Sequence, residues 1–182
     1  MSTVIAVVGV PGSGKSTLIK EFMKDDEWFL CKPDDLVEGY ISSKNNVFLM
    51  GKYEEGEVFS GTDRLSMAVQ PKAIEYLQGS PADVVLFEGD RLTTTSFFHA
   101  VKQAGHQLVI IELTVSDDIR EQRYIDRGSD QSEQFIQSRF TKLRNIKNEF
   151  GANLFDDGDI RSFEHTTPED TRKIIEFIDG CM

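Results

Sequence analysis

One short stretch constrains the chain more than any other: Gly9-Val10-Pro11-Gly12-Ser13-Gly14-Lys15-Ser16-Thr17. It matches the pattern G-x-x-x-x-G-K-[ST] at every fixed position. A β-branched run at 4–8 precedes it, and an amphipathic stretch at 18–23 follows. A strand that turns through glycines into a helix is the context in which this pattern forms a phosphate-binding loop.

The residue types in this loop suit a nucleotide triphosphate. Glycines let the backbone turn with its N–H groups pointing inward, at the positive end of the following helix. Lys15 would reach the β- and γ-phosphates, and the Ser16 hydroxyl would complete the coordination of Mg²⁺. We therefore expect ATP and Mg²⁺ as cofactors. The predicted cofactor-binding residues are Gly9, Pro11, Gly12, Ser13, Gly14, Lys15, Ser16 and Thr17.

Composition indicates a soluble single domain over 1–182. The chain has 182 residues, is 39% hydrophobic and contains 13 Phe, which is enough for a full core. Cys31 and Cys181 are too few for a disulfide framework. No charged-then-apolar leader is evident, and no apolar run approaches the ~20 residues of a membrane span. The expected location is the cytoplasm, or the host cytoplasm if a phage encodes the protein.

Charge is distributed unevenly along the chain. The formal net charge is −11, which argues against a body that attracts polyanions everywhere. Residues 120–147 carry seven basic and four acidic side chains, so this segment is +3 and the remainder is −14. Within it, the helical stretch from 135 to 147 has four cations and no acid, a pattern that could follow a phosphate backbone. Solubility is the alternative explanation.

Apolar runs alternate with helical patterns along the chain. The predicted strands are Val4–Val8, Trp28–Cys31, Val84–Phe87, Leu108–Leu113 and Arg161–His165. Strands separated by helices imply right-handed crossovers and a parallel sheet covered on both faces. We therefore expect a three-layer α/β/α fold with a mostly parallel five-stranded sheet. Ser116-Asp117-Asp118 and Thr167-Pro168-Glu169-Asp170 mark the starts of two helices.

The region from Asp34 to Asp63 departs from this alternation. Its length indicates an acceptor-site insertion, taken as residues 36–66. Residues 46–53 and 57–60 could pair as a hairpin around Glu54-Glu55-Gly56. Its aromatic side chains would form a stacking surface for a nucleobase or a small satellite core.

Together these features resemble the P-loop kinases of the nucleoside-monophosphate-kinase type. The resemblance rests on the phosphate loop, the short second strand, Glu88-Gly89-Asp90-Arg91 after an apolar strand, and Leu113-Thr114-Val115-Ser116 leading to Arg123-x-x-x-Arg127-Gly128. It implies a lid and basic helix at 120–150, closing over ATP. Arg123 and Arg127 are four apart, so one helix face presents both to phosphate oxygens, with Gly128 as a hinge. A salt-bridged surface helix is the alternative.

The resemblance also implies roles for acidic residues at strand ends. Glu88 would hold a Mg²⁺-bound water, orient the acceptor or act as a base, although an Asp is commoner there in the family. Asp34 and Asp35 resemble the acidic pair of kinases that phosphorylate a hydroxyl, which must lose a proton as it attacks. An N-cap for the following residues is their other interpretation.

Four further residues are candidates for binding the acceptor. Asp63 and Arg64 lie in the compact stretch 61–66, and Asp90 with Arg91 follow Glu88. The stretch Gly61–Met67 resembles bacteriophage kinases that phosphorylate the 5-hydroxymethyl group of hydroxymethyluracil in DNA, which makes that DNA the expected acceptor.

Two other functions stay open from the sequence. A kinase of a free nucleotide or nucleoside monophosphate would not need Asp34 or Asp35, since a phosphate acceptor is already an anion. A nucleotide-dependent switch or ATPase is the third, although no Asn-Lys-x-Asp signature is present. The sequence does not define the oligomeric state.

Overall fold

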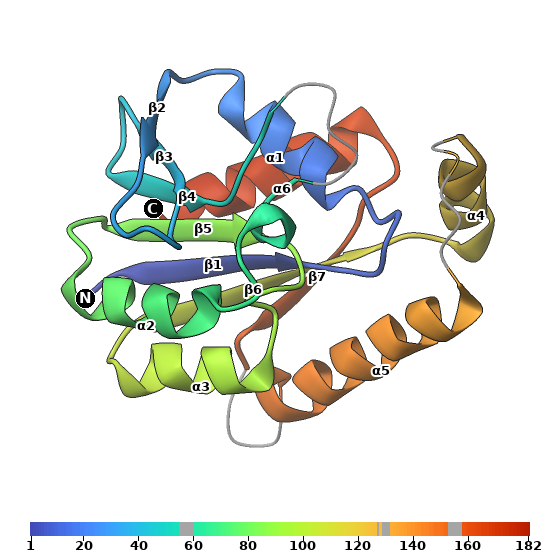
Figure 1. The fold of residues 1–182 in the computed structure, drawn as a ribbon. Helices are drawn as coiled ribbons and strands as arrows, with labels where there is room; N and C mark the ends of the chain where they lie inside the picture. The colour runs from blue at the N-terminus through green and yellow to red at the C-terminus, as the bar shows by residue number, and fades with distance from the viewer. Residues whose placement is uncertain (55–59, 127, 129–131, 153–157) are drawn as a thin grey trace.

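A central β-sheet carries helices on both faces (Figure 1). The computed structural model describes residues 1–54, 60–126, 128, 132–152 and 158–182. Within these residues the sheet has seven strands, namely β1 (Thr3–Val8), β2 (Trp28–Cys31), β3 (Gly39–Ser42), β4 (Val47–Met50), β5 (Val84–Glu88), β6 (Gln107–Thr114) and β7 (Ile160–Glu164). Their order across the sheet is β2-β3-β4-β5-β1-β6-β7.

The strands that form the functional edge are parallel. β4, β5, β1, β6 and β7 are neighbours in that order and run in one direction. Only β3, among the described strands, pairs antiparallel with both of its neighbours. The carboxyl ends of the parallel strands therefore share one edge, where ligands bind in open α/β sheets. The phosphate loop after β1 and Glu88 at the end of β5 both lie at this edge.

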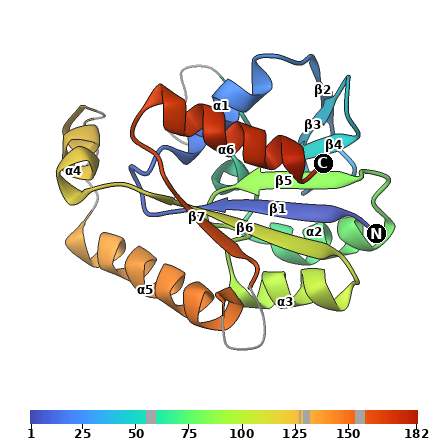
Figure 2. The ribbon, with the colours of Figure 1, turned by 180° about the vertical axis from the view of Figure 1, so that it is seen from behind.

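Helices form the two outer layers. They are α1 (Lys15–Met23), α2 (Val69–Gly79), α3 (Thr95–Gln103), α4 (Asp117–Asp126), α5 (Glu133–Phe150) and α6 (Pro168–Gly180), with a 3-10 turn η1 (Thr62–Arg64). Both views show α1 and α6 on one face of the sheet and α2, α3 and α5 on the other (Figures 1 and 2). α4 lies beyond the carboxyl edge of the strands. The structure thus confirms the predicted three-layer α/β/α fold.

Alternation along β1 divides the core into two layers. Val4, Ala6 and Val8 pack toward the layer of α2, α3 and α5. Ile5 and Val7 pack toward α1 and α6. Both sets are almost completely buried. Burial from both sides explains why the run is continuously apolar instead of alternating with polar residues.

The predicted number of strands was wrong. Residues 47–50 form β4, an interior strand that pairs in parallel with β5, while residues 39–42 form β3. The predicted second strand, Trp28–Cys31, lies at the edge of the sheet as β2. All four residues of β4 are buried, whereas Phe29 and Leu30 of β2 are more than half exposed. A short apolar run without alternation fits a doubly covered strand better than a surface hairpin.

The predicted hairpin of 46–53 with 57–60 can be followed only in part. Residues 55–59 lie outside the described part of the chain. β4 pairs with the upstream strand β3, and after it Lys52 forms an antiparallel bridge with Gly61. This bridge brings residues 52 and 61 together, one after β4 and the other before η1.

Two further findings concern the cysteines and the apolar character of the helices. Cys31 and Cys181 are free thiols. Among the helices that the structure describes, none has both the length and the apolar character that crossing a bilayer demands.

The contrast between β4 and β2 gives a stability test. We expect Phe48→Ala in β4 to lower the free energy of unfolding by about 3–5 kcal/mol, because it leaves a cavity where the ring is fully buried. The matched variant Phe29→Ala in β2 removes a ring that is 56% exposed and should cost less than about 1 kcal/mol. Denaturant unfolding measures both. Equal losses would contradict the central position of β4.

Candidate active site

The phosphate loop joins β1 to α1 with a helix start that lacks a side-chain cap. Gly12 and Gly14 have φ angles of 81° and 90°, a left-handed region that favours glycine. Gly14 is the N-cap of α1, so no side chain accepts a hydrogen bond from the first amides, and the first turn holds no acid. By contrast, α3, α5 and α6 each begin with a capping hydroxyl, from Thr94, Ser132 and Thr167. The first turn of α1 therefore has neither a capping side chain nor an acid that would compete with an anion.

Side chains of the loop carry further polar groups. Lys15 Nζ donates to the carbonyl oxygens of Gly9 at 2.9 Å and Val10 at 3.3 Å, so the ammonium group lies over the loop. The Ser13 hydroxyl is completely buried and has no hydrogen-bond partner among the described residues. A buried polar atom without a partner costs free energy unless a ligand or water satisfies it. Both observations suit a phosphate group held by the loop.

Glu88 connects β5 to this loop. Its Oε1 accepts hydrogen bonds from Ser16 Oγ at 3.0 Å and from Ser60 Oγ at 3.1 Å. The side chain is only 2% exposed. Burial raises the pKa of Glu88, while the charge of Lys15 and the hydrogen bond from Ser16 oppose this shift. Strands β1 and β5 are direct neighbours, which is why their carboxyl ends bring Ser16 and Glu88 together.

The Ser16 hydroxyl and the Glu88 carboxylate are hard oxygen ligands of the kind that Mg²⁺ prefers. No group of three or more His, Cys, Asp or Glu side chains with metal-binding geometry occurs in the described part of the chain. Mg²⁺ commonly binds through one or two protein oxygens together with phosphates and waters. The pair therefore fits a cation that arrives with a nucleotide and does not fit an independent metal centre.

Helix α4 packs directly against the loop. Arg123 donates to the Gly12 carbonyl oxygen at 2.8 Å and to the His165 carbonyl oxygen at 3.2 Å. The Tyr124 hydroxyl donates to the Pro11 carbonyl oxygen at 2.7 Å. The structure thus brings Arg123 to the phosphate loop. Arg127, its predicted partner, lies outside the described residues.

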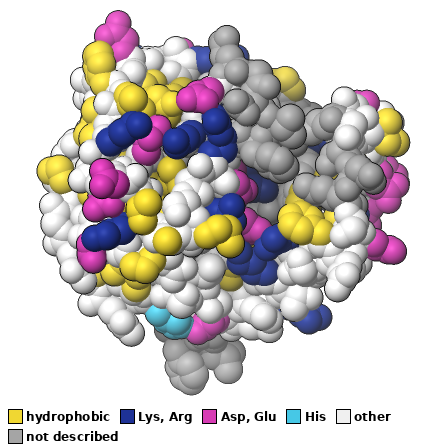
Figure 3. Space-filling model, viewed as in Figure 1, with side chains coloured by type: hydrophobic (Ala, Val, Ile, Leu, Met, Phe, Trp, Pro, Cys, Tyr) yellow, Lys and Arg dark blue, Asp and Glu magenta, His cyan; other side chains and the backbone are white. Residues whose placement is uncertain are grey.

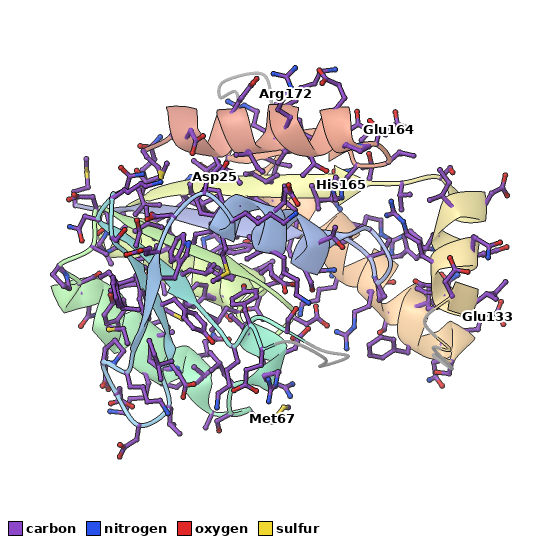
Figure 4. The ribbon with its side chains drawn as sticks, turned by 90° about the horizontal axis from the view of Figure 1, so that it is seen from above. Asp25, Met67, Glu133, Glu164, His165 and Arg172 are labelled. Carbon is purple, nitrogen blue, oxygen red and sulfur yellow. The ribbon has the colours of Figure 1, made fainter. Side chains whose placement is uncertain are left out.

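His165 supports the loop from the side of α6. Its Nδ1 lies 3.0 Å from the Ser13 carbonyl oxygen and its Nε2 lies 2.9 Å from Thr171 Oγ1. Figure 4 shows this residue between α1 and α6. A Cβ at Gly14 would come within 2.5 Å of the imidazole, so only glycine leaves room for this packing. The sequence analysis missed this role, because a single His after a strand carries no recognisable pattern.

A cavity of about 770 Å³ adjoins the loop on the same side. Its lining includes Gly14, Thr17 and Arg123 together with residues 165–168. Farther out it is bounded by Asp25, which follows α1, and by residues of α6 that include Arg172 (Figure 4). A cavity of this size holds a small organic ligand. A molecule with phosphates on the loop would place its remaining part here.

A second group of charges lies on the other side of Lys15. Asp90, just after Glu88, forms ion pairs with Arg139 at 2.5 Å and with Lys142 at 3.1 Å. The Lys142 ammonium also donates to the Asp90 carbonyl oxygen at 2.9 Å. Gly9, Lys15, Asp90, Arg139 and Lys142 all line one small cavity. α5 therefore brings two cations to the phosphate loop, in addition to Arg123 of α4.

The stretch 61–64 packs on the turn after β5. Asp63 Oδ1 accepts a hydrogen bond from the Asp90 backbone N–H at 2.6 Å. Arg64 forms an ion pair with Glu54 at 2.6 Å. Arg91 Nε donates to the Leu65 carbonyl oxygen at 3.4 Å. The structure thus brings the four predicted acceptor residues to one side of the phosphate loop, where Asp63 and Asp90 already make contacts within the protein.

Asp34 and Asp35 lie apart from this group. They follow edge strand β2, which is four strand positions from β1, or about 20 Å across the sheet at the usual spacing of ~4.8 Å. Asp34 Oδ1 accepts from the Leu36 backbone N–H at 3.0 Å, and its carboxylate lies 3.8 Å from Lys72 of α2. The structure shows no contact between Asp34 and the described residues of the phosphate loop. The alternative, an N-cap for residues 36–38, is wrong, because no helix begins at these residues and the Asp34 carboxylate accepts this turn hydrogen bond instead.

The basic stretch of α5 is neutralised within the protein to a large extent. Arg139 and Lys142 pair with Asp90, and Lys147 pairs with Glu112 at 3.0 Å. Figure 3 shows basic and acidic side chains intermixed on this face. The stretch from 135 to 147 contains no acid, but the compensating carboxylates come from elsewhere in the fold, namely Asp90 after β5 and Glu112 in β6.

Several contributors to the site were not among the predicted site residues. They are Tyr53, Ser60, Tyr124, Arg139, Lys142 and His165. Burial and the nearby Glu88 raise the pKa of Tyr53 well above its ordinary value, so the phenol stays protonated. For Arg139 and Lys142 a signal was present, namely two cations three apart within the predicted lid and basic helix at 120–150. Their partner Asp90 became apparent only from the fold.

Comparisons with known proteins agree with this geometry. The family model described as P-loop Nucleotide Kinase3 matches residues 1–180. No curated protein matches the chain.

Similar solved structures are kinases at low identity. An unliganded sugar kinase from Janibacter sp. HTCC2649 has a TM-score of 0.48 and 11% identity, covering 98% of this chain and 95% of that one. Deoxyadenosine kinase from M. mycoides with the products dCMP and a flexible dCDP has a TM-score of 0.47 and 10% identity, with 98% and 100% coverage. The same enzyme with dATP has a TM-score of 0.46 and 14% identity, with 97% of each chain covered. These values are too low to assign an acceptor.

The family model covers nearly the whole chain, including the phosphate loop, Glu88 and the helices that pack around them. We conclude that the chain belongs to the P-loop Nucleotide Kinase3 family and is an ATP-dependent kinase.

Proposed function

We propose that this kinase transfers the γ-phosphate of ATP to the phosphate of a nucleotide, most simply a nucleoside monophosphate. The triphosphate would bind the amides at the start of α1, with Lys15 over its β- and γ-phosphates. The adenosine would fill the cavity of about 770 Å³ between the loop, Arg123 and 165–168. Thr17 belongs to the wall of this cavity and would face the nucleotide.

The observation that carries the choice of acceptor is the pair of cations on α5. Arg139 and Lys142 line a small cavity with Lys15 and with their partner Asp90, so three cations and one carboxylate lie beside the expected position of the γ-phosphate and leave net positive charge there. A phosphate acceptor needs cationic groups that reduce its repulsion from the γ-phosphate, and it does not need a base. Asp34 and Asp35, the proposed bases for a hydroxyl, are at the other end of the sheet edge. The arrangement of charges therefore favours an anionic acceptor.

The roles of the residues follow from this geometry. Mg²⁺, bound with ATP at Ser16 and Glu88, would neutralise phosphate charge. Lys15 and the loop amides would hold the phosphates in place, while Arg123 from α4 would cover them. Stabilising the charge on the transferring phosphoryl group is the main contribution a protein makes to this reaction. Arg64 and Arg91, next to the turn after β5, would face the acceptor.

Hydroxymethyluracil in DNA is the second candidate acceptor. The stretch 61–67 that resembles the bacteriophage kinases lies against the turn after Glu88, on the acceptor side. Met67 is 78% exposed, which leaves the outer end of this stretch open to a large substrate. For this acceptor the hydroxyl proton would need a base, and Glu88 is the carboxylate nearest to the phosphate loop among the described contacts.

A labelling experiment tests the acceptor. Purified protein is incubated with γ-labelled ATP and Mg²⁺ against nucleosides, nucleoside monophosphates, plain DNA and DNA that contains hydroxymethyluracil. We expect the label in a nucleoside diphosphate, and only when a monophosphate is present. Label in the modified DNA alone would contradict the main proposal and support the second. Addition of EDTA in excess over Mg²⁺ should abolish the transfer.

Substitutions of the acidic residues separate the two chemistries. We expect Asp34→Asn and Asp35→Asn to change kcat by less than about threefold, because a phosphate acceptor needs no base and Asn at position 34 retains the oxygen that accepts from the Leu36 backbone. Glu88→Gln should lower kcat by about a hundredfold or more, because it removes the charge beside the Mg²⁺ position. Steady-state kinetics with the labelled acceptor measure all three.

Circular dichroism and thermal unfolding serve as the control that each variant is folded. A loss of about a hundredfold in Asp34→Asn or Asp35→Asn would contradict the phosphate acceptor and indicate a base at that position.

A further inference from the structure

The segment 60–65 is bound tightly to the turn 88–91. Thr62 Oγ1 donates to the Glu88 carbonyl oxygen at 2.9 Å, and Asp63 Oδ1 accepts from the Asp90 backbone N–H at 2.6 Å. Ser60 Oγ donates to the Glu88 carboxylate at 3.1 Å. Thr62 is fully buried, and Ser60 is 7% exposed. These hydrogen bonds are therefore largely shielded from water, where they contribute most.

Two glycines allow the close approach of these segments. Gly61 has a φ angle of 71°, and a Cβ there would come within 2.6 Å of the Glu88 carbonyl oxygen. Gly89 has a φ angle of 108°, and its Cβ would come within 2.7 Å of Thr62 Oγ1. Any other residue at either position would be strained and would collide. The two backbones thus form one packed unit.

Asp90 extends this unit to α5. Its backbone is bound by Asp63, while its side chain is bound by Arg139 and Lys142. The Arg139 guanidinium also stacks on the Phe135 ring, with its central carbon 4.3 Å from the ring centre. Each side chain of the Asp90, Arg139 and Lys142 cluster is less than one third exposed. A carboxylate is needed here because two neighbouring cations, together with Lys15, repel one another.

We infer that Asp63 is a positioning residue that acts through Asp90: its carboxylate fixes the Asp90 backbone, and Asp90 holds Arg139 and Lys142 beside Lys15. The inference rests on the proposed function, in which those cations face the phosphates. It replaces direct acceptor binding by Asp63 and Asp90 with an indirect role. The acceptor-side segment and the cations of α5 are then coupled through the hydrogen bond from the Asp90 N–H to Asp63, the hydrogen bond from Lys142 to the Asp90 carbonyl oxygen, and two ion pairs.

In this role Asp63 needs the side-chain oxygen that accepts the hydrogen bond and does not need its negative charge. A pair of substitutions separates these two properties. Asp63→Asn retains Oδ1 and should keep kcat within about threefold of the wild-type value. Asp63→Ala removes the acceptor and should lower kcat by about tenfold or more, because misplaced phosphate-binding cations stabilise the transition state less. KM for the acceptor should change by less than about threefold in both. Glu75→Gln, an exposed carboxylate on α2, is the control.

Asp90→Asn should also lower kcat by about tenfold or more, since a neutral amide holds two cations weakly. The double variant Asp63→Ala with Asp90→Asn should lose no more than the more impaired single variant, because both act through the same cations. Independent losses that multiply would overturn the inference. So would an Asp63→Asn variant with a strongly raised acceptor KM, the result expected of a charged acceptor ligand.

A second readout separates this inference from the choice of acceptor. If the wild-type protein labels no monophosphate, the proposed acceptor is wrong. The same variants are then compared by their intrinsic ATP hydrolysis, followed as ADP release, which also requires stabilisation of the transferring phosphoryl group. The order should remain Asp63→Asn near the wild type, with Asp63→Ala and Asp90→Asn clearly below it. Equal rates in all variants would refute the positioning role.

Discussion

The uncapped start of α1 is the feature on which the site depends. Three of the other described helices satisfy their first amides with a Ser or Thr hydroxyl, whereas α1 begins at left-handed Gly14 and has no such acceptor. His165 fills the space beside Gly14 and bonds the loop carbonyl, which holds the loop without covering its amides. The start of α1 thus carries no side-chain cap that would compete with an anion for its first amides.

The sheet decides which side chains reach that group. Parallel pairing of β1 with β5 brings Glu88 to hydrogen-bonding distance of Ser16, and the turn after Glu88 then places Asp90 beside α5. Burial raises the pKa of Glu88, whereas the charge of Lys15 and the hydrogen bond from Ser16 lower it, so both groups stabilise the ionised carboxylate. The phosphate loop and the end of β5 are therefore one electrostatic unit, although they are more than 70 residues apart in sequence.

Local patterns predicted the local parts of the site and missed the parts set by strand order. The phosphate loop, the start of α4 after Ser116 and the capping box at Thr167 all follow from residues next to one another, and the structure contains each of them. The apolar run Val47–Met50 fits a hairpin strand as well as an interior strand of a sheet. Only its pairing with β5 in the fold shows that it is an interior strand. Because β3 and β4 lie between β2 and β5, β2 is at the edge of the sheet, and Asp34, which follows β2, is at that edge as well.

Local charge, more than net charge, explains how an acidic protein can handle anionic substrates. With a formal charge of −11, the chain as a whole repels polyanions, yet Lys15, Arg139 and Lys142 share one cavity and Arg123 lies across the phosphate loop. Asp90 pairs with Arg139 and Lys142, so positive charge still exceeds negative charge among the side chains that line this cavity. Exposed carboxylates farther away are screened over a Debye length of roughly 8 Å at physiological salt. Under the proposed function, a small nucleotide at the loop would meet mainly these side chains, whereas a long DNA would also meet the rest of a chain whose formal net charge is negative. This balance of charge supports the proposal of a compact acceptor.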